Sequence, residues 1–221
     1  MGILYGVGVN DRNLCGPGSY KASEGVWAMY PEYQMWKGLI NRCFSEKEKI
    51  RRSACSDSMC CPEWVHRKAF QDWYYSHSHH NDNSGTTLQI DKDILFINNQ
   101  LYSPHTTVLV PQYVNLSVRK LAKGDTPWVA KVQKGARMIN EFKRPWRYDV
   151  RCGDENYSKC SFVTKLDAHM AAQLIKIDYL HGIIDRYRKE ACYDPRVEQG
   201  VMNRIQILQK ANTKGRVCRI F

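Results

Sequence analysis

Three charged residues and a carboxamide stand in the middle of the chain, between Leu88 and Asn115. Asp91, Lys92 and Asp93 share one short predicted element, and Asn115 falls at a predicted helix start. Carboxylate and carboxamide oxygens suit Mg²⁺, which proteins usually hold with only one or two carboxylates. The pattern therefore predicts a site for Mg²⁺ (or Mn²⁺), beside a basic residue that suits phosphodiester chemistry.

The same residues also have a purely structural interpretation. Asp-Lys-Asp is common at exposed strand edges, and Asn115 is of a type that caps helices. Spacing alone favours this structural interpretation over a metal site. Between Asp93 and Asn115 the chain has a turn at Asn98-Asn99, the segment Tyr102-Ser103-Pro104, and an apolar run that ends at Pro111, so a strand, a return and a helix start could bring the oxygens together.

The run LQIDKDILFINNQLYSPHTTVLVPQYVN resembles the HNH-type endonucleases of bacteriophages, often described as homing endonucleases. That family builds a ββα-metal site from a strand, a return and a helix. The resemblance implies that Asp91 and Asn115 bind the metal ion and that Asp93 supports the site. It places Lys92 where a general-base His usually stands.

Two residues depart from the family pattern. Lys92 replaces the usual His, and Thr106 replaces a supporting Asn. A lysine is protonated near neutral pH and must lose that proton to act as a base. Lys92 would then neutralise developing charge or help to activate water, His105 is a second candidate base, and a metal-bound water needs neither. An active nuclease and an inactive DNA-binding protein therefore both stay open.

The second half of the chain has a different pattern. WVAKVQ (128–133) alternates like a strand, further strands are predicted at 138–142, 146–150 and 160–163, and Thr164 opens a long helix. We expect a three-stranded antiparallel sheet packed on that helix. The expected apolar stripe of the helix is Leu166, Met170, Leu174, Ile177, Leu180 and Ile184.

These residues resemble the AP2-like DNA-binding domain that follows many phage HNH domains. The shared pattern is W-x-A-x-V, then F-x-T, then A-H-x-A, here starting at Trp128, Phe162 and Ala168. The resemblance implies that the sheet enters the major groove of DNA. The predicted DNA-contacting residues are Trp128, Lys131, Lys134, Arg137, Lys143, Arg144, Trp146, Arg147 and Arg151. The alternative is an ordinary basic sheet face with aromatic core residues.

The remaining segments complete an α+β organisation. We expect an N-terminal arm with little regular structure (1–30), an HNH-like domain (31–120), an AP2-like domain (121–190) and a basic extension (191–221). Pro31 to Phe44 is predicted as a helix with Tyr33, Trp36, Ile40 and Cys43 on its apolar face. A short helix is predicted over 197–209, and basic residues from Arg204 onward are candidate phosphate contacts.

Composition limits the class of protein. The 221 residues carry a formal net charge of +11, and residues 121–189 hold fourteen Lys and Arg against eight Asp and Glu. This charge favours a polyanionic partner over an ordinary basic surface, and the resemblance to DNA-binding families implies that the partner is double-stranded DNA. No run approaches the roughly 18 apolar residues of a membrane span, so we expect no membrane and a cytoplasmic location, in the host cell if the chain is phage-encoded.

Nine cysteines in a cytoplasmic chain are expected to be reduced thiols. Cys55, Cys60 and Cys61 lack the paired spacing of a zinc site, even with His66 added, so we expect no structural zinc. The loop SHSHHNDNSGTT is expected to carry exposed histidines. Together these patterns predict a phage-type HNH-like DNA endonuclease; a DNA-binding protein without catalysis, and an interaction protein for a host factor, are the alternatives.

Overall fold

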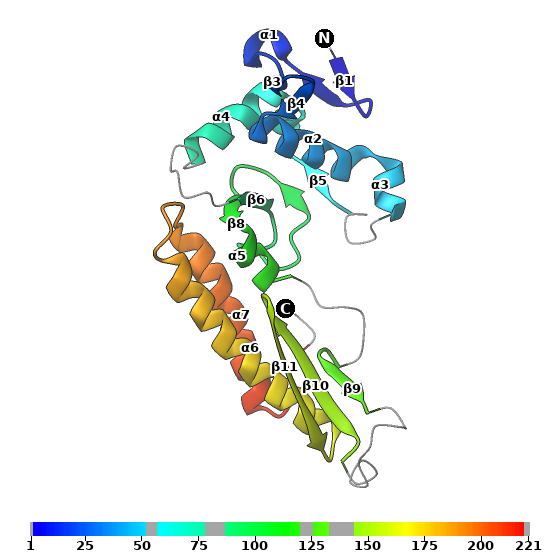
Figure 1. The fold of residues 1–221 in the computed structure, drawn as a ribbon, viewed down its shortest axis with the longest axis vertical. Coiled ribbons are helices and arrows are strands. Elements are labelled where there is room, and N and C mark those ends of the chain that lie inside the picture. Colours follow the sequence, from blue (N-terminus) through cyan, green and yellow to red (C-terminus); the bar gives the residue numbers. More distant parts are fainter. Residues whose placement is uncertain (1, 52–56, 78–86, 120–125, 133–143, 219–221) are drawn as a thin grey trace. The chain divides into compact units, whose positions relative to one another are not determined.

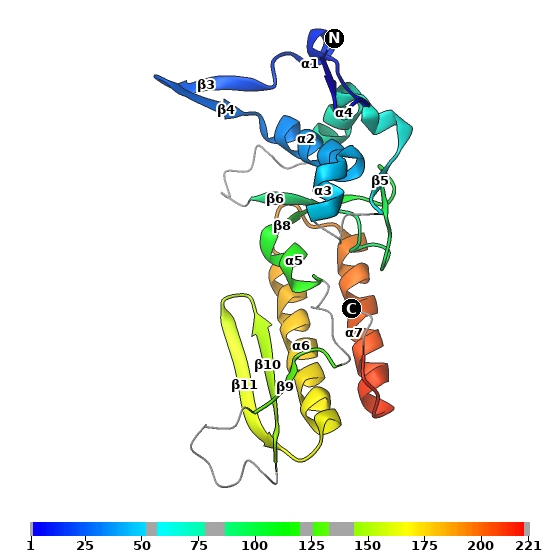
Figure 2. The same ribbon diagram turned by 90° about the vertical axis from the view of Figure 1, so that its right-hand side faces the viewer.

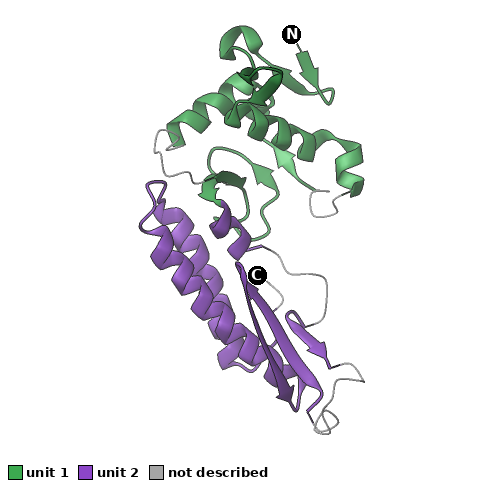
Figure 3. Ribbon diagram, in the orientation of Figure 1, with its two compact units in different colours: residues 1–111 green, residues 112–221 purple. Residues whose placement is uncertain are grey.

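A computed structural model of the chain describes residues 2–51, 57–77, 87–119, 126–132 and 144–218. The chain divides into two compact units, Met1–Pro111 and Gln112–Phe221 (Figure 3). Both units combine helices with small sheets, so the expected α+β class is confirmed. The unit boundary falls before residue 120, where the sequence predicted a domain to end, and the second unit includes the predicted C-terminal extension.

The first unit pairs its strands two at a time (Figure 1). Its strands are β1 (Gly2–Leu4), β2 (Gly8–Asn10), β3 (Ser19–Ser23), β4 (Val26–Met29), β5 (Met59–Cys60), β6 (Leu88–Asp91), β7 (Leu101–Tyr102) and β8 (Val108–Pro111). β1 pairs with β2, β3 with β4 and β6 with β8, all antiparallel, while β5 and β7 are parallel. Its helices are α1 (Arg12–Cys15), α2 (Pro31–Phe44), α3 (Glu46–Arg51), α4 (Arg67–His77) and a 3-10 helix, η2 (Pro62–Val65).

The helix α2 confirms the prediction for residues 31–44. Pro31 stands at its first turn, where a proline loses no helical hydrogen bond. Trp36, Ile40 and Cys43 are buried, and the indole Nε1 of Trp36 donates to the Trp64 carbonyl at 2.9 Å. The helix therefore presents the predicted apolar face to the core.

Aromatic side chains from η2 and α4 complete the core of the first unit. Trp64, Phe70 and Trp73 are buried together against α2. The Trp64 ring centroid lies 5.2 Å from that of Phe70 and 4.6 Å from that of Trp73, within the range of favourable aromatic pairs.

Residues 1–30 are not the irregular arm that the sequence predicted. They form β1 to β4 and α1, and Figure 2 shows the β3–β4 hairpin extending away from α2 and α4. The buried Arg67 of α4 holds the segment by donating to the carbonyls of Gly16 at 2.9 Å and Pro17 at 3.2 Å. Because Arg67 lies about fifty residues downstream of Gly16 and Pro17, local sequence patterns do not reveal this contact.

The second unit contains one sheet and three described helices. Its elements are α5 (Gln112–Ser117), β9 (Val129–Lys131), β10 (Trp146–Cys152), β11 (Glu155–Phe162), α6 (Lys165–Tyr187) and α7 (Pro195–Thr213). The antiparallel strand order is β11-β10-β9. α6 packs on β10 and also on α7, which gives three layers, sheet, α6 and α7 (Figure 2). The predicted strand at 138–142 lies outside the described residues.

The start of α6 confirms the predicted cap, but its buried face differs from the predicted stripe. The side chain of Thr164 accepts a hydrogen bond from the Asp167 N–H at 3.0 Å. Leu166 and Leu174 are 39% and 56% exposed. Leu180 and Ile184 of the stripe are buried as predicted, whereas the first half of the helix buries small or polar residues such as Ala172 and Gln173, because α6 packs on both the sheet and α7.

The helix α7 is longer than the predicted 197–209. Asp194 caps its N-terminus by accepting from the Arg196 N–H at 2.8 Å, and Pro195 occupies the first turn. Within the described ranges, no helix is both long and apolar enough to cross a membrane.

Candidate functional site

Asp91 ends β6, and its carboxylate closes the turn that follows. Oδ1 accepts hydrogen bonds from the backbone N–H groups of Asp93 and Ile94, each at 2.7 Å. Ile94 is fully buried and anchors the turn to the core. Two backbone donors on one carboxylate oxygen fix the direction of the other oxygen. The sequence placed Asp91, Lys92 and Asp93 on one element; in the structure the strand ends at Asp91 and the next two residues lie in the turn.

Lys92 is buried and hydrogen-bonded within the same loop. Its Nζ donates to both carboxylate oxygens of Asp93 at 3.0 Å and to the Asn99 carbonyl at 2.6 Å. All these partners are acceptors, so Nζ serves here as a donor. This geometry suits the predicted electrostatic role of Lys92 and gives no support to its role as a base.

Asn99 stabilises, through hydrogen bonds, the end of the loop that leads into β7. Its Nδ2 donates to the carbonyls of Lys92 at 2.9 Å and Leu101 at 2.8 Å, and its Oδ1 accepts from the Leu101 N–H at 3.1 Å. Asn98, at φ 64°, provides the left-handed residue of the predicted turn, a conformation that asparagine tolerates well. The loop from residue 91 to residue 101 is therefore held by its own side chains.

Thr106, which replaces the expected Asn, has a structural role in the return between β7 and β8. Its Oγ1 donates to the Leu101 carbonyl at 2.6 Å and lies 2.9 Å from the Ser103 hydroxyl. His105 is exposed at the tip of the same turn. An exposed imidazole here is accessible to solvent, so His105 stays a candidate base.

Asn115 lies on α5, in the second unit. Tyr113 of this helix donates to Glu190 at 2.9 Å, and its ring centroid lies 3.8 Å from the Arg186 guanidinium carbon. These contacts attach α5 to the end of α6. A metal site shared by Asp91 and Asn115 joins residues of two units and stays a prediction.

The described residues contain no group of three or more His, Cys, Asp and Glu side chains arranged to hold a metal ion. Cys60 instead donates to the Cys61 carbonyl at 3.3 Å, and burial raises the pKa of its thiol well above the ordinary value. His77, which belongs to the predicted loop of exposed histidines, lies at the end of α4 with Nδ1 2.9 Å from the Trp73 carbonyl. Cys55, His79 and His80 lie outside the described residues.

The sheet of the second unit has two different faces. Tyr148, Val150 and Cys152 of β10 are buried against Ala172 of α6. Because side chains alternate along a strand, Arg147, Asp149 and Arg151 point away from α6. The register places Ser158 beside Asp149 and Asn156 beside Arg151 on that same side.

We call the residues on this side the open face: Ala130, Arg147, Asp149, Arg151, Asn156 and Ser158. Arg147 Nε lies 3.1 Å from Asp149 Oδ2, an ion pair without hydrogen-bond geometry, and the exposed Arg151 Nε donates to the Gly153 carbonyl at 3.2 Å. Gly153, at φ 66°, and Asp154 form the tight turn between β10 and β11. The open face therefore combines two guanidinium groups with the carboxylate of Asp149 and the small polar side chains of Asn156 and Ser158.

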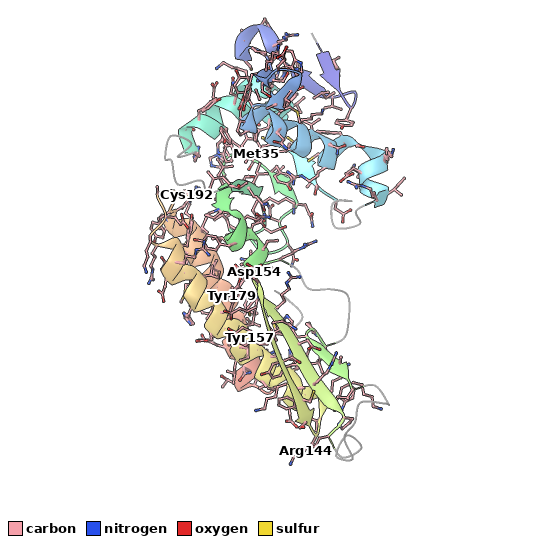
Figure 4. All side chains as sticks on the ribbon, in the orientation of Figure 1. Met35, Arg144, Asp154, Tyr157, Tyr179 and Cys192 are labelled. Atoms are coloured by element: carbon pink, nitrogen blue, oxygen red, sulfur yellow. The ribbon has the colours of Figure 1, made fainter. Side chains whose placement is uncertain are left out.

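The other predicted DNA contacts are distributed differently. Trp128 is partly buried, packs against the buried cluster and stacks on His169 with ring centroids 5.7 Å apart, so its role as a DNA contact stays a prediction. Lys131 pairs with Trp146, which lies on the face opposite to Arg147. Exposed Arg144 precedes β10, at the end of the sheet opposite the turn that holds Asp154 (Figure 4). Lys134, Arg137 and Lys143 lie outside the described residues.

The open face includes two polar residues that sequence reasoning missed, Asn156 and Ser158. Alternation from the Gly153-Asp154 turn was the signal that could have found them. Arg204, predicted as a phosphate contact, is only 2% exposed and donates to the Gly200 carbonyl at 2.9 Å within α7. It is a helix-packing residue in this structure.

Comparison with known proteins finds no matching family model, no matching curated protein and no matching solved structure.

Proposed function

We propose that this chain binds double-stranded DNA through the open face of its β9–β10–β11 sheet. The observation that carries the proposal is the placement of Arg147 and Arg151 on one face of β10, turned away from α6. Four residues of strand span about 13 Å. This spacing is close to the width of the major groove, about 12 Å, which admits a two-stranded β-ribbon.

The polar residues of the open face suit contacts to DNA. Arginine side chains bind guanine edges or phosphates with a planar fork of donors. Asn156 and Ser158 sit on the neighbouring strand beside Arg151 and Asp149 and can donate and accept at base edges. The net charge of +11 adds a long-range attraction for the polyanion.

The test is binding of wild-type protein to a short duplex over a series of salt concentrations. We expect the logarithm of the binding constant to fall linearly with the logarithm of salt, because each neutralised phosphate releases counterions. Absence of binding, or binding that salt leaves unchanged, would refute the proposal. Salt-insensitive capture of a host protein instead would favour the interaction-protein alternative.

Metal-dependent cleavage of that DNA is a second candidate function, in the manner of the HNH-type endonucleases. It is favoured by Asp91, whose carboxylate is held by two backbone donors beside the cation of Lys92. Carboxylate oxygens are the ligand type that Mg²⁺ prefers, so the Asp91 side chain suits the ion. When bound, Mg²⁺ would supply Lewis-acid stabilisation of a phosphate oxygen.

Two substitutions separate the structural role of Asp91 from a role in metal binding. Asp91→Asn keeps a side-chain acceptor for the Asp93 and Ile94 N–H groups but loses the charge, whereas Asp91→Ala loses both. We expect Asp91→Asn to unfold at nearly the wild-type temperature yet to lose Mg²⁺ binding in calorimetry and nicking of plasmid DNA. Equal Mg²⁺ binding and equal metal-dependent nicking in both variants and the wild type would eliminate Asp91 from the site.

A further inference from the structure

Arg42 lies near the C-terminal end of α2, on the face of an aromatic ring. Its guanidinium carbon is 5.2 Å from the ring centroid of Tyr102, and Nζ of Lys92 is 5.8 Å from the same centroid. Tyr102 is buried, so the ring is a fixed support rather than a mobile side chain. Two cations from α2 and from the Asp91 loop therefore share one aromatic residue.

The two cations differ in how their charge is compensated. Lys92 donates to the Asp93 carboxylate at 3.0 Å. Arg42 makes no ion pair within 4.0 Å among the described residues, and its buried Nε has no hydrogen-bond partner there. The Arg42 side chain is half-buried.

A half-buried guanidinium without an anion is costly unless something completes its hydrogen bonds. Stacking on Tyr102 and a position in the last turn of α2 offset part of this cost, since the C-terminal end of a helix attracts cations. Neither gives Nε an acceptor. The ligand class that completes a planar guanidinium fork is an oxyanion, a carboxylate or a phosphate.

We propose that Arg42 binds a phosphate group of the DNA backbone beside the Asp91 loop. The inference rests on the proposed DNA binding and adds a phosphate contact in the first unit. Because Lys92 is already paired with Asp93, the anion at this place would be bound by Arg42, and a phosphodiester is the anion that the proposed substrate carries. Arg42 is thus a substrate-positioning residue, held ready by its stacking on Tyr102.

The test compares Arg42→Gln and Arg42→Lys with wild type in binding to a short duplex at several salt concentrations. Arg51→Gln is the matched control, because Arg51 is already paired with Glu48 at 2.7 Å. We expect Arg42→Gln to lower the magnitude of the salt slope by about 0.9 and to weaken binding about tenfold near 0.1 M salt. Arg42→Lys retains the slope, and Arg51→Gln changes neither quantity. Thermal melting of each variant verifies folding.

Several outcomes would overturn the assignment. A wild-type slope in Arg42→Gln, or an equal decrease in Arg51→Gln, removes Arg42 from the interface while leaving DNA binding by the sheet intact. A melting temperature raised by inorganic phosphate in wild type but not in Arg42→Gln, with DNA binding unaffected by Arg42→Gln, would assign the site to free phosphate instead. If wild type binds no DNA, the proposed function and this inference are both wrong.

Discussion

The guanidinium of Arg67 lies 3.4 Å from the carboxylate of Glu32, and both side chains are buried. Arg67 also donates to Gly16 and Pro17 and its guanidinium carbon lies 4.6 Å from the Tyr33 ring centroid. One buried cation thus joins α4, α2 and the N-terminal segment. The N-terminal segment, which includes the run YGVGVND (residues 5–11), therefore packs against the helix that carries Arg67.

Removing Arg67 should therefore destabilise the first unit. Arg67→Met leaves Glu32 buried without its cation, and breaking a buried pair from one side costs about 3–5 kcal/mol. Urea unfolding followed by circular dichroism measures the loss. Lys68→Met is the control, because the Lys68–Asp72 pair is exposed and should contribute little. Comparable losses in the two variants would contradict this role for Arg67.

Gly8 should tolerate no side chain. A Cβ at this position would lie 2.8 Å from Cγ2 of Ile40, in the fully buried centre of α2. We expect Gly8→Ala to lower the free energy of unfolding by about 1–3 kcal/mol.

Gly38→Ala is the opposite case on the same helix that holds Ile40. A Cβ there meets nothing within 4 Å, and alanine is the better helix former by about 0.5–1 kcal/mol. It should raise the unfolding temperature of the unit that Gly8→Ala lowers. If both variants shifted the unfolding temperature in the same direction, the close approach of Gly8 to Ile40 would not be what determines the effect of Gly8→Ala.

His169, the histidine of the A-H-x-A pattern, should make the second unit sensitive to acid. Its Nε2 accepts from the Cys218 N–H at 3.1 Å and its Nδ1 lies 3.0 Å from the Pro127 carbonyl, so the neutral ring fits with the proton on Nδ1. Burial lowers the pKa of His169 from its ordinary 6.5. The unfolded chain then binds a proton near pH 6.5 that the folded chain does not.

The resulting contribution to stability is complete above pH 6.5 and decreases as the pH falls through the lower folded pKa. Unfolding free energies measured between pH 7.5 and pH 5 should decrease more steeply in wild type than in His169→Phe, which does not titrate; these two pH limits are about one unit or more either side of 6.5. Parallel curves would rule out His169 as the source.

Lys176 on α6 should be a destabilising residue at neutral pH. It is 5% exposed, and burial lowers the pKa of its amine to about 8. The folded unit must therefore carry a poorly solvated ammonium below about pH 8, whereas the unfolded chain does so at no cost. We expect Lys176→Met to raise the free energy of unfolding by about 1–3 kcal/mol at pH 7.

The gain from Lys176→Met should shrink as the pH rises from 8 toward 10.5, where the amine is increasingly neutral in both states. Urea unfolding of both proteins at pH 7 and near pH 10 measures this dependence. A variant less stable than wild type at pH 7 would mean that the Lys176 contacts, such as its position 4.8 Å from the Tyr179 ring centroid, outweigh the burial.

Long elements with local signals could be predicted from the sequence. Pro31 and a regular apolar face define α2, and the Thr164 cap defines the start of α6. Strands of three residues in the N-terminal segment could not be predicted, because their stability comes from Arg67, far along the chain. The stripe of α6 was misassigned because helix patterns favour large apolar residues, while close packing on the sheet needs Ala172.

The sequence identified the types of residue in the candidate site, but it did not predict the contacts that those residues make. The motif located Asp91 and Lys92 without revealing that Asp91 closes its own turn or that Lys92 bonds to Asn99. The alternation of WVAKVQ predicted Trp128, Ala130 and Val132 on one strand face, yet the left-handed backbone of Trp128, φ 62°, interrupts that alternation and β9 begins at Val129. Side-chain direction in an irregular segment depends on tertiary packing.

DNA binding by the double variant Arg147→Gln/Arg151→Gln tests the open face most directly. The control, Arg188→Gln/Arg196→Gln, removes two cations of the same unit that lie at the end of α6 and in α7, outside the β9–β10–β11 sheet. We predict that the first variant lowers the salt slope by about 2 and weakens duplex binding about a hundredfold near 0.1 M salt, while the control stays close to wild type. Equal affinities and slopes in all three proteins would contradict DNA recognition by this sheet.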